Sequence, residues 1–246
     1  IFQDIFGIVQ EAIPGHSGIP NYLDYPVKTP EDWKKLKEER LQLKLDERIG
    51  CDLKEFGEWA KTADHIIQIG GFPYGLFGTL RDMMGVDNLM YAFYDEPEMI
   101  HDMMDTLTDL WLAIYEEICK YVKVDCIQMW EDMSGKAGPL ISPNMMREFM
   151  VPNYRKIRKF CDEHDIPIFS MDTDGDCSLI FDILIESGIN LLFPLEVQAG
   201  SDVVKIKEQY PDQFCILGGV DKREISKSKE DIDRAVKEAE QYAAQD

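Results

Sequence analysis

The sequence predicts an α/β fold in which a parallel sheet is covered by helices. From residue 65 onward, short apolar segments alternate with amphipathic segments in the order β-α-β-α-β-α-β-α-β-α. This regular alternation is typical of a parallel sheet with helices packed against it. Each predicted strand also ends in a polar or glycine-rich segment, which is where parallel α/β proteins place their chemistry.

The chain has 246 residues, of which 45% are hydrophobic, and this is enough for one large domain with a sizeable core. Its formal net charge of -21 argues against nucleic-acid binding, which rests on clustered lysines and arginines. No apolar run reaches the length of about 18 residues that a membrane span needs. The cysteines form no Cys-x-x-Cys pair, which favours reduced thiols in a cytoplasmic protein.

Residues 1–64 are predicted to form an extended and helical N-terminal part. Glycines and prolines break its first half into short extended segments. Thr29 and Pro30 are typical of a helix start, because threonine caps the first turn and proline needs no hydrogen-bond partner there. We expect this helix to continue to about residue 46, and a second helix to cover 52–60.

Residues 65–246 are predicted to form regular βα units, and together with the N-terminal part they make a single domain, 1–246. Asp95 and Glu98 flank a helix start and predict a capping box, in which side chains satisfy free backbone N–H groups. The predicted strands cover 65–70, 124–130, 166–170, 190–193 and 213–217. The predicted helices are two short segments split near Gly85, followed by 95–121, 142–163, 177–187, 201–210 and 229–244.

The most informative segment is Ile168–Asp176, in which a buried strand ends in several carboxylates next to a helix start. Acids follow other predicted strands as well, so strand ends that converge on one face would form an acidic ring. Crowded carboxylates repel one another, which raises the pKa of some of them or requires a shared cation. The predicted ring consists of Glu131, Asp132, Asp172, Asp174, Glu196 and Asp221, with Lys222 and Arg223 as the nearest cations.

Helix capping offers a simpler explanation for any single acid at a strand end, because helix N-termini strongly favour aspartate. Asp176, directly before the helix predicted over 177–187, is expected to be such a cap. Acids at most of the strand ends are harder to explain by capping alone. We therefore expect a functional site where these ends meet.

Several segments between residues 65 and 222 resemble the uroporphyrinogen decarboxylase superfamily. They occur in order along the chain and are more specific for the superfamily than for one reaction. The resemblance implies a (β/α)8 TIM barrel, which would be incomplete in this chain unless the N-terminal extended segments supply strands. The matching segments are Gly70–Tyr74, Tyr94–Glu98, Glu131–Pro143, Phe193–Val197 and Leu217–Lys222.

One branch of the superfamily that these motifs resemble removes acetate carboxyl groups from uroporphyrinogen III without a cofactor. The other branch holds zinc and moves a methyl group between a corrinoid and a thiol or another acceptor. In the zinc branch a His-x-Cys-Gly motif follows this strand, and here the matching residues are Asp172, Thr173, Asp174 and Gly175. Zinc that activates a thiol favours nitrogen and sulfur ligands, so this replacement predicts a harder, oxygen-rich site.

The resemblance favours a barrel enzyme similar to the corrinoid-linked methyltransferases, with a small methyl donor or acceptor at the acidic strand ends. Asp172 and Asp174 are the first catalytic candidates, as metal ligands or as general acid and base, and Glu131 and Glu196 complete the polar wall. The implied cofactors are a divalent metal, which is zinc in relatives, and a corrinoid carried by a partner protein. The expected substrate-binding residues are Gly71, Phe72, Tyr74, Trp130, Asp221 and Lys222.

Two alternative functions stay open. Uroporphyrinogen III decarboxylation, a lyase reaction of porphyrin biosynthesis, needs no cofactor but needs cations for a carboxylate-rich substrate, and Arg223 is the arginine near a predicted strand end. A non-catalytic barrel that binds a ligand or a partner is the other alternative, because open strand edges invite pairing. A dimer is compatible with each of these functions, and neither nucleic acid nor a membrane is expected as a partner.

Overall fold

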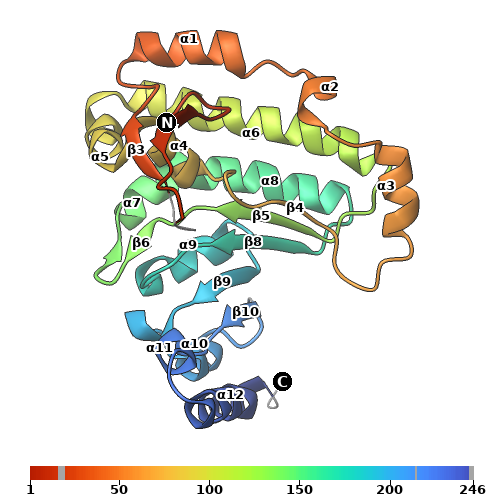
Figure 1. Cartoon of the computed structure of the whole chain (residues 1–246), viewed down its shortest axis with the longest axis vertical. Coiled ribbons are helices and arrows are strands. Elements are labelled where there is room, and N and C mark those ends of the chain that lie inside the picture. The colour runs from red at the N-terminus through yellow and green to blue at the C-terminus, as the bar shows by residue number, and fades with distance from the viewer. Residues whose placement is uncertain (16–19, 214, 244–246) are drawn as a thin grey trace. The chain divides into compact units, whose positions relative to one another are not determined.

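The computed structural model describes residues 1–15, 20–213 and 215–243. The chain divides into two compact units, an N-terminal unit, Ile1–Val124, and a C-terminal unit, Asp125–Asp246. In Figure 1 the N-terminal unit runs from red to yellow-green and the C-terminal unit from green to blue. Helices and strands alternate along much of the chain, which confirms the predicted α/β class.

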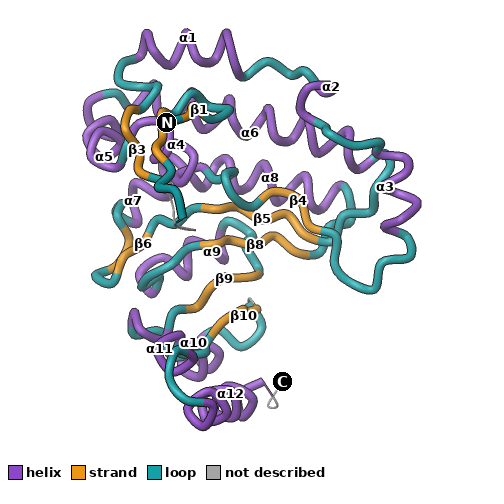
Figure 2. The backbone as a smooth tube through the Cα atoms, viewed as in Figure 1, coloured by secondary structure: helices purple, strands orange, loops and turns teal. Residues whose placement is uncertain are grey.

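The N-terminal unit begins with a small antiparallel sheet, which accounts for the predicted extended segments. Strand β1 (Phe2–Gln3) pairs with β2 (Val9–Glu11), and β2 pairs with β3 (Asn21–Asp24). Figure 2 draws strands in orange, and this sheet lies close to the label N. Asp4 fixes the turn after β1, because its carboxylate accepts hydrogen bonds of 3.0 Å from the backbone N–H groups of residues 6–8.

Helix α1 (Pro30–Arg40) begins where the sequence predicts it but ends earlier. Thr29 caps the first turn, where its hydroxyl accepts a backbone N–H at 3.2 Å. The predicted longer helix is wrong, because the Arg48 guanidinium donates to the carbonyl of Arg40 at 2.6 Å and replaces the next helical N–H. A short helix, α2 (Leu45–Arg48), follows.

The rest of the N-terminal unit is mainly helical. Its elements are α3 (Leu53–Ala60), β4 (Gln68–Gly70), α4 (Leu76–Met84), α5 (Val86–Asp95) and α6 (Pro97–Cys119). The capping box predicted from Asp95 and Glu98 is wrong, because Glu96 is the N-cap of α6 and its side chain makes no capping hydrogen bond. Pro97 is well suited to the first position of α6, since the backbone N–H that proline lacks would have no partner within the helix there. None of the helices in the described ranges is long and apolar enough to cross a membrane.

The strands of the C-terminal unit pair in parallel, as predicted, and lie side by side in the order β10-β9-β8-β5. They are β5 (Cys126–Trp130), β8 (Ile168–Asp172), β9 (Leu191–Leu195) and β10 (Cys215–Gly218). Phe214, which belongs to the strand predicted over 213–217, lies outside the described residues.

Strand β8 begins and ends two residues later than the predicted strand 166–170, so Asp172 is its last residue. The register pairs Asp172 with Trp130 of β5 and with Phe193 of β9. The carboxylate-bearing end of β8 therefore lies between the ends of two neighbouring strands.

The helix predicted over 142–163 is confirmed in extent but contains a π-helical stretch, Met146–Met150. Pro152 explains this irregularity, because proline has no N–H for the preceding turn and its ring crowds a carbonyl there. Beyond this stretch, the remaining elements are β6 (Ser134–Gly135), β7 (Gly138–Pro139), α7 (Pro143–Met145), α8 (Val151–Glu163), α9 (Phe181–Glu186), α10 (Val203–Gln209), α11 (Lys222–Ile225) and α12 (Lys229–Ala243).

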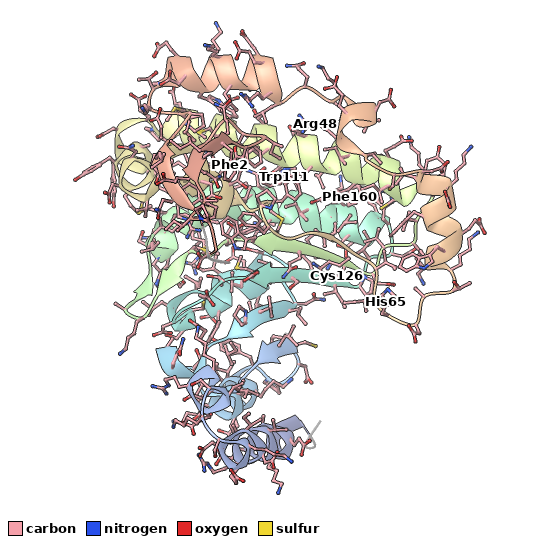
Figure 3. The ribbon with its side chains drawn as sticks, viewed as in Figure 1. Phe2, Arg48, His65, Trp111, Cys126 and Phe160 are labelled. Carbon is pink, nitrogen blue, oxygen red and sulfur yellow. The ribbon has the colours of Figure 1, made fainter. Side chains whose placement is uncertain are left out.

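Helix α8 packs against the sheet through aromatic side chains. The buried ring of Tyr154 lies edge-on to the ring of Phe169 on β8, with centroids 6.2 Å apart. Farther along α8, Phe160, which Figure 3 labels, lies 4.2 Å from the ring of His164. Cys126 of β5, also labelled there, is a free thiol, and burial raises its pKa to about 11.

Gly57 in α3 provides a stability test of the N-terminal unit. A Cβ atom at this position would lie 2.2 Å from the backbone carbonyl oxygen of Tyr121. We expect Gly57→Ala to lower the free energy of unfolding by about 1–3 kcal/mol, the usual cost of overpacking. Gly50→Ala is the control, because its Cβ meets no atom within 4 Å. Urea unfolding measures both variants, and equal stabilities would contradict the packing of α3.

Candidate functional site

The site is built around the backbone of Asp172 at the end of β8. Its carbonyl oxygen accepts two hydrogen bonds, from the N–H of Glu131 at 2.8 Å and from the N–H of Asp132 at 3.2 Å. These bonds bend the segment after β5 across the end of β8, and Asp132 takes a left-handed backbone conformation with a φ of 40°. The ends of the two strands therefore form one structural unit.

Thr173 connects this unit to the next strand. Its buried hydroxyl accepts from the N–H of Met133 at 3.1 Å and donates to the carbonyl of Asp174 at 3.3 Å. The N–H of Thr173 donates to the carbonyl of Phe193 on β9 at 2.8 Å. Sequence reasoning missed this role, because a threonine between two acids carries no signal that distinguishes it from a loop residue.

Gly175 has no room for a side chain. Its φ is 83°, and a Cβ atom would lie 2.5 Å from the backbone carbonyl oxygen of Ser134. The N–H of Gly175 donates to the Oε2 atom of Glu196 at 2.8 Å. The tight turn at Gly175 therefore brings the acid after β9 to the loop after β8.

The electrostatics of Asp172 are the most unusual of the site. Burial raises the pKa of its carboxyl group from the ordinary 3.8 to about 6, and the negative charges of Asp174 and Asp132 act in the same direction. The pKa of Asp174 is raised as well, first by partial burial and then by the charges of Glu196 and Asp132. The structure thus brings four acids of the predicted ring together.

Lys222 is the cation of this acidic cluster. Its ammonium group forms an ion pair with Glu196, whose carboxylate also accepts from the Gln198 amide at 2.8 Å. The hydrogen bond from Lys222 lowers the pKa of Glu196, and the positive charge of Lys222 partly opposes the upward shift at Asp174. Lys222, predicted to bind substrate, therefore lies at the acidic cluster.

Glu131 does not join this cluster through its side chain. It follows Trp130 by one residue, and because strand side chains alternate, it points to the opposite face from Trp130 and its register partner Asp172. Glu131 is 0% exposed, and its Oε1 atom accepts from the Tyr154 hydroxyl at 2.8 Å. Burial, followed by the charge of Glu131 and this hydrogen bond, raises the pKa of Tyr154 well above its ordinary value.

Two further acids at strand ends bind neighbouring groups of their own loops. Asp176 accepts from the N–H of Ser178 at 2.9 Å in the turn before a short 3-10 helix, Ser178–Ile180. Its predicted role as a helix cap is wrong, because Cys177 is the N-cap of that helix and α9 begins only at Phe181. Asp221 caps α11, and its carboxylate accepts hydrogen bonds from the Arg223 guanidinium. The hydrogen bonds from Arg223 lower the pKa of Asp221 to about 2. Asp221, which was predicted to bind substrate, thus has a structural partner of its own.

The remaining predicted substrate residues, Gly71, Phe72 and Tyr74, form a turn between β4 and α4 in the N-terminal unit. The N–H of Tyr74 donates to the carbonyl of Gly71 at 2.7 Å. The Tyr74 ring packs edge-on against Trp111 of α6, labelled in Figure 3, at a centroid distance of 5.9 Å. Phe72 is 65% exposed, so its ring has free surface for a ligand.

The residues at the β8 end do not fit a thiolate-activating zinc ion. The predicted metal ligands, Asp172 and Asp174, supply oxygen atoms, whereas such zinc ions favour nitrogen and sulfur. Cys177, the thiol of this loop, is buried, and burial raises its pKa to about 11, which keeps it protonated. Across the described residues, no three His, Cys, Asp or Glu side chains form a group that could hold a metal ion.

Parallel strands with acids gathered at their carboxyl ends define an α/β protein with a strand-end site. The chain belongs to the uroporphyrinogen decarboxylase (URO-D) family, whose model matches residues 7–246. The family implies a TIM barrel, although the described residues form no closed barrel. A comparison with curated proteins finds no match to this chain.

A solved structure of a methyltransferase from Methanosarcina mazei is similar to this chain, with a TM-score of 0.58 and 15% sequence identity. The similarity covers 87% of this chain and 60% of that chain, so this chain spans less than two thirds of the methyltransferase. At this identity the likeness shows the fold, and it agrees with the predicted barrel class.

Tyr154 provides a test of the structural role of Glu131. Tyr154→Phe removes the hydroxyl that donates to a fully buried carboxylate. We expect the free energy of unfolding to fall by about 1–3 kcal/mol, the usual cost of a lost partner in the interior. Tyr91→Phe is the control, because Tyr91 is 71% exposed. Equal chemical stabilities of the two variants would show that the Tyr154 hydroxyl does not support Glu131.

Gly175 provides a matched test of the tight turn. Gly175→Ala combines an unfavourable φ with the contact to Ser134, whereas Gly200→Ala has a φ of 98° and open space around its Cβ. We expect Gly175→Ala to be less stable than Gly200→Ala by about 1–3 kcal/mol, which is the cost of the overlap alone. Thermal and urea unfolding measure this difference, and its absence would rule out the close approach.

Proposed function

We propose that this protein is a methyltransferase that acts on a small molecule at the acidic end of β8. Support comes from the family match and from a fold shared with a methyltransferase of Methanosarcina mazei. A corrinoid on a partner protein is the proposed methyl carrier, as in the relatives that the sequence motifs resemble. In such a carrier the methyl group is bound to a metal centre. The metal centre would keep both bonding electrons when the methyl group is transferred.

The position of Asp172 is the observation that carries the proposal, because this acid ends β8 between two neighbouring strand ends. Its pKa agrees with the role. Burial raises this pKa to about 6, and the charges of Asp174 and Asp132 act in the same direction. The carboxyl group is therefore ionised near neutral pH and still basic enough to take a proton.

In the proposed step, Asp172 is the general base. A small acceptor places its S–H, N–H or O–H group against the Asp172 carboxylate. The heteroatom attacks the methyl carbon, and the new bond forms as the bond to the carrier breaks. The electron pair of that bond stays with the carrier, and the proton of the acceptor moves to Asp172. Lys222 and Glu196 form the charged wall beside this position.

Uroporphyrinogen decarboxylation has weaker support from the same site. A substrate with many carboxylates would be repelled by Asp132, Asp172 and Asp174. The guanidinium of Arg223, the arginine expected to hold such a substrate, already donates hydrogen bonds to both carboxylate oxygens of Asp221. This alternative and a non-catalytic binding role become outcomes of the experiments below.

Asp172→Asn tests the general base directly. We expect the rate of methyl transfer from methylcobalamin to a panel of small thiols and amines to fall by about 100-fold or more. The wild-type rate should rise with pH through about 6 and then level off, because only ionised Asp172 accepts the proton. Asp176→Asn is the control, because Asp176 accepts from the N–H of Ser178 in a turn and an asparagine retains that hydrogen bond.

Several outcomes would overturn the proposal. Turnover of uroporphyrinogen III by the metal-free protein would assign decarboxylation instead. A stoichiometric metal that is lost in Asp172→Ala would assign metal binding to the β8 end in place of proton transfer. Wild-type protein that is folded and inactive toward every methyl acceptor and uroporphyrinogen would favour a binding function.

The pH dependence of stability tests the pKa of Asp172 without an activity assay. The folded-state pKa of about 6 exceeds the ordinary 3.8, so the folded protein binds more protons between these values. Stability from this group is therefore present at low pH and is lost as pH rises toward 6. We expect Asp172→Asn to unfold at higher urea concentration than wild type at pH 7 and at nearly the same concentration at pH 4. A constant difference across this range would contradict the shift.

A further inference from the structure

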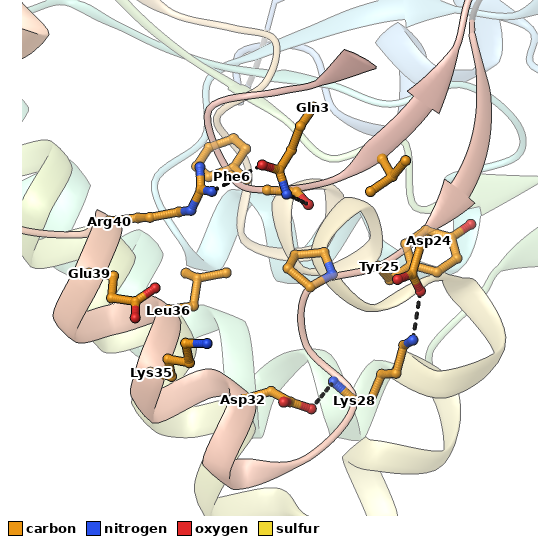
Figure 4. A pocket seen from close by; sticks show the side chains of 13 residues that line it. Gln3, Phe6, Asp24, Tyr25, Lys28, Asp32, Lys35, Leu36, Glu39 and Arg40 are labelled. Atoms are coloured by element: carbon orange, nitrogen blue, oxygen red, sulfur yellow. Dashed lines mark hydrogen bonds and ion pairs between the residues drawn. The ribbon is translucent and has the colours of Figure 1, made fainter. Parts of the chain in front are cut away.

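A cavity of about 330 Å³ opens in the N-terminal unit between its small sheet and α1 (Figure 4). This volume lies within the range of about 300–1,000 Å³ that small-molecule pockets occupy. Every lining residue falls between Gln3 and Arg40, so the cavity shares no residue with the acidic site after β8. The family reaction proposed above leaves this cavity without a role.

The lining combines apolar surface with balanced charge. Phe6 and Leu36 are each 6% exposed and supply apolar surface, to which Pro26 adds. The cationic lining residues are Lys28, Lys35 and Arg40, and the acidic ones are Asp24, Asp32 and Glu39. In a chain with a net charge of -21, a pocket with equal numbers of cations and acids is far less negative than the average surface.

Half of these charges are already used within the protein. The Lys28 ammonium group pairs with Asp24 at 2.6 Å. Asp32 accepts from the N–H of Thr29 at 3.0 Å and from the Thr29 hydroxyl at 3.1 Å, which belongs to the cap of α1. These interactions hold residues of the cavity wall in place, and Figure 4 marks the Lys28–Asp24 pair with a dashed line. They leave Arg40, Lys35 and Glu39 for a ligand.

Arg40 is held in place by neutral groups. Its guanidinium donates to the carbonyl of Ile5 at 3.2 Å and to the Oε1 atom of Gln3 at 3.3 Å. Among the described residues Arg40 has no carboxylate partner, so a fixed guanidinium charge faces the cavity uncompensated. Such a group is suited to bind a carboxylate.

Lys35 and Glu39 are the other charges available to a ligand. They lie four residues apart on α1, on the side that lines the cavity with Leu36 and Arg40. Within the described ranges, neither side chain forms an ion pair or a side-chain hydrogen bond, not even with the other. The free charges at the cavity are therefore two cations and one carboxylate, next to buried apolar side chains.

We propose that this cavity binds a zwitterion, an amino acid with an apolar side chain. Arg40 and Lys35 bind the carboxylate of the ligand, and Glu39 binds its ammonium group. The apolar side chain of the ligand lies against Phe6 and Leu36. The assignment stands independently of the methyl-transfer function, because the cavity and the acidic site have no residue in common.

Isothermal titration calorimetry on the whole chain tests this assignment with three probes. L-leucine carries both charges, 4-methylpentanoate keeps its carbon skeleton and carboxylate without the ammonium group, and 3-methylbutylamine keeps the ammonium group alone. We expect leucine to bind most tightly, 4-methylpentanoate more weakly and 3-methylbutylamine not at all. Equal affinities for leucine and 4-methylpentanoate would overturn a zwitterion site, and so would the absence of leucine binding.

Variants locate the binding and separate it from a structural role of Arg40. Lys35→Met and Arg40→Met should each raise the Kd for leucine by about tenfold or more, the cost of one charge-assisted contact. Glu39→Gln should bring the Kd for leucine to that for 4-methylpentanoate. Lys34→Met is the matched control, because Lys34 lies on α1 outside the lining.

Since the Lys35 side chain makes no ion pair or hydrogen bond with the described residues, Lys35→Met stays informative even if Arg40→Met fails to fold. Unchanged leucine binding in Lys35→Met would overturn the proposal. Asp172→Asn should retain full leucine binding. A loss of binding in that variant would place leucine at the acidic site and would equally overturn the assignment to this cavity.

Discussion

The carbonyl oxygen of Asp172 is the acceptor on which the acidic site depends. By accepting the N–H groups of both Glu131 and Asp132, it brings the end of β5 over the end of β8. Asp132 and Asp172 would otherwise separate, because their charges repel one another. Backbone hydrogen bonds in a packed sheet offset this repulsion. The pKa of Asp172 is raised first by burial and then by the charges of Asp174 and Asp132.

The ion pairs around the strand ends give the two cations different acidic partners. Lys222 pairs with Glu196 and Arg223 pairs with Asp221, although the two cations are neighbours in sequence. Burial and neighbouring negative charges still raise the pKa of Asp172 and of Asp174. For the proposed function, this arrangement favours neutral or cationic small molecules at the β8 end over polyanions.

Much of the fold could be predicted from the sequence, because it depends on local signals. Alternating apolar segments predicted the order of strands and helices, and Thr29 and Ser142 predicted helix starts that the structure contains. The end of α1 could not be predicted, because it depends on Arg48, a residue from the next helix. The π-helical stretch before Pro152 is an irregularity that periodicity does not reveal.

The candidate site was predictable in place and less so in detail. The motif predicted that Asp172, Asp174 and Glu196 lie close together, since the carboxyl ends of parallel strands lie at the same edge of a sheet. It could not show that the Glu131 side chain lies on the other face, because that depends on the register with β8 and on Tyr154 of α8. Thr173 was missed because its role lies in hydrogen bonds to the loop after β5 and to β9.

The turn at Gly175 sets different constraints on the positions of one short motif. A side chain there would meet the backbone of Ser134, so packing restricts that position to glycine, whatever reaction takes place. The conformation of the turn does not depend on the carboxylates of Asp172 and Asp174. A lineage could therefore exchange His-x-Cys-Gly for Asp-x-Asp-Gly by changing its donors, while the glycine and the shape of the loop persisted.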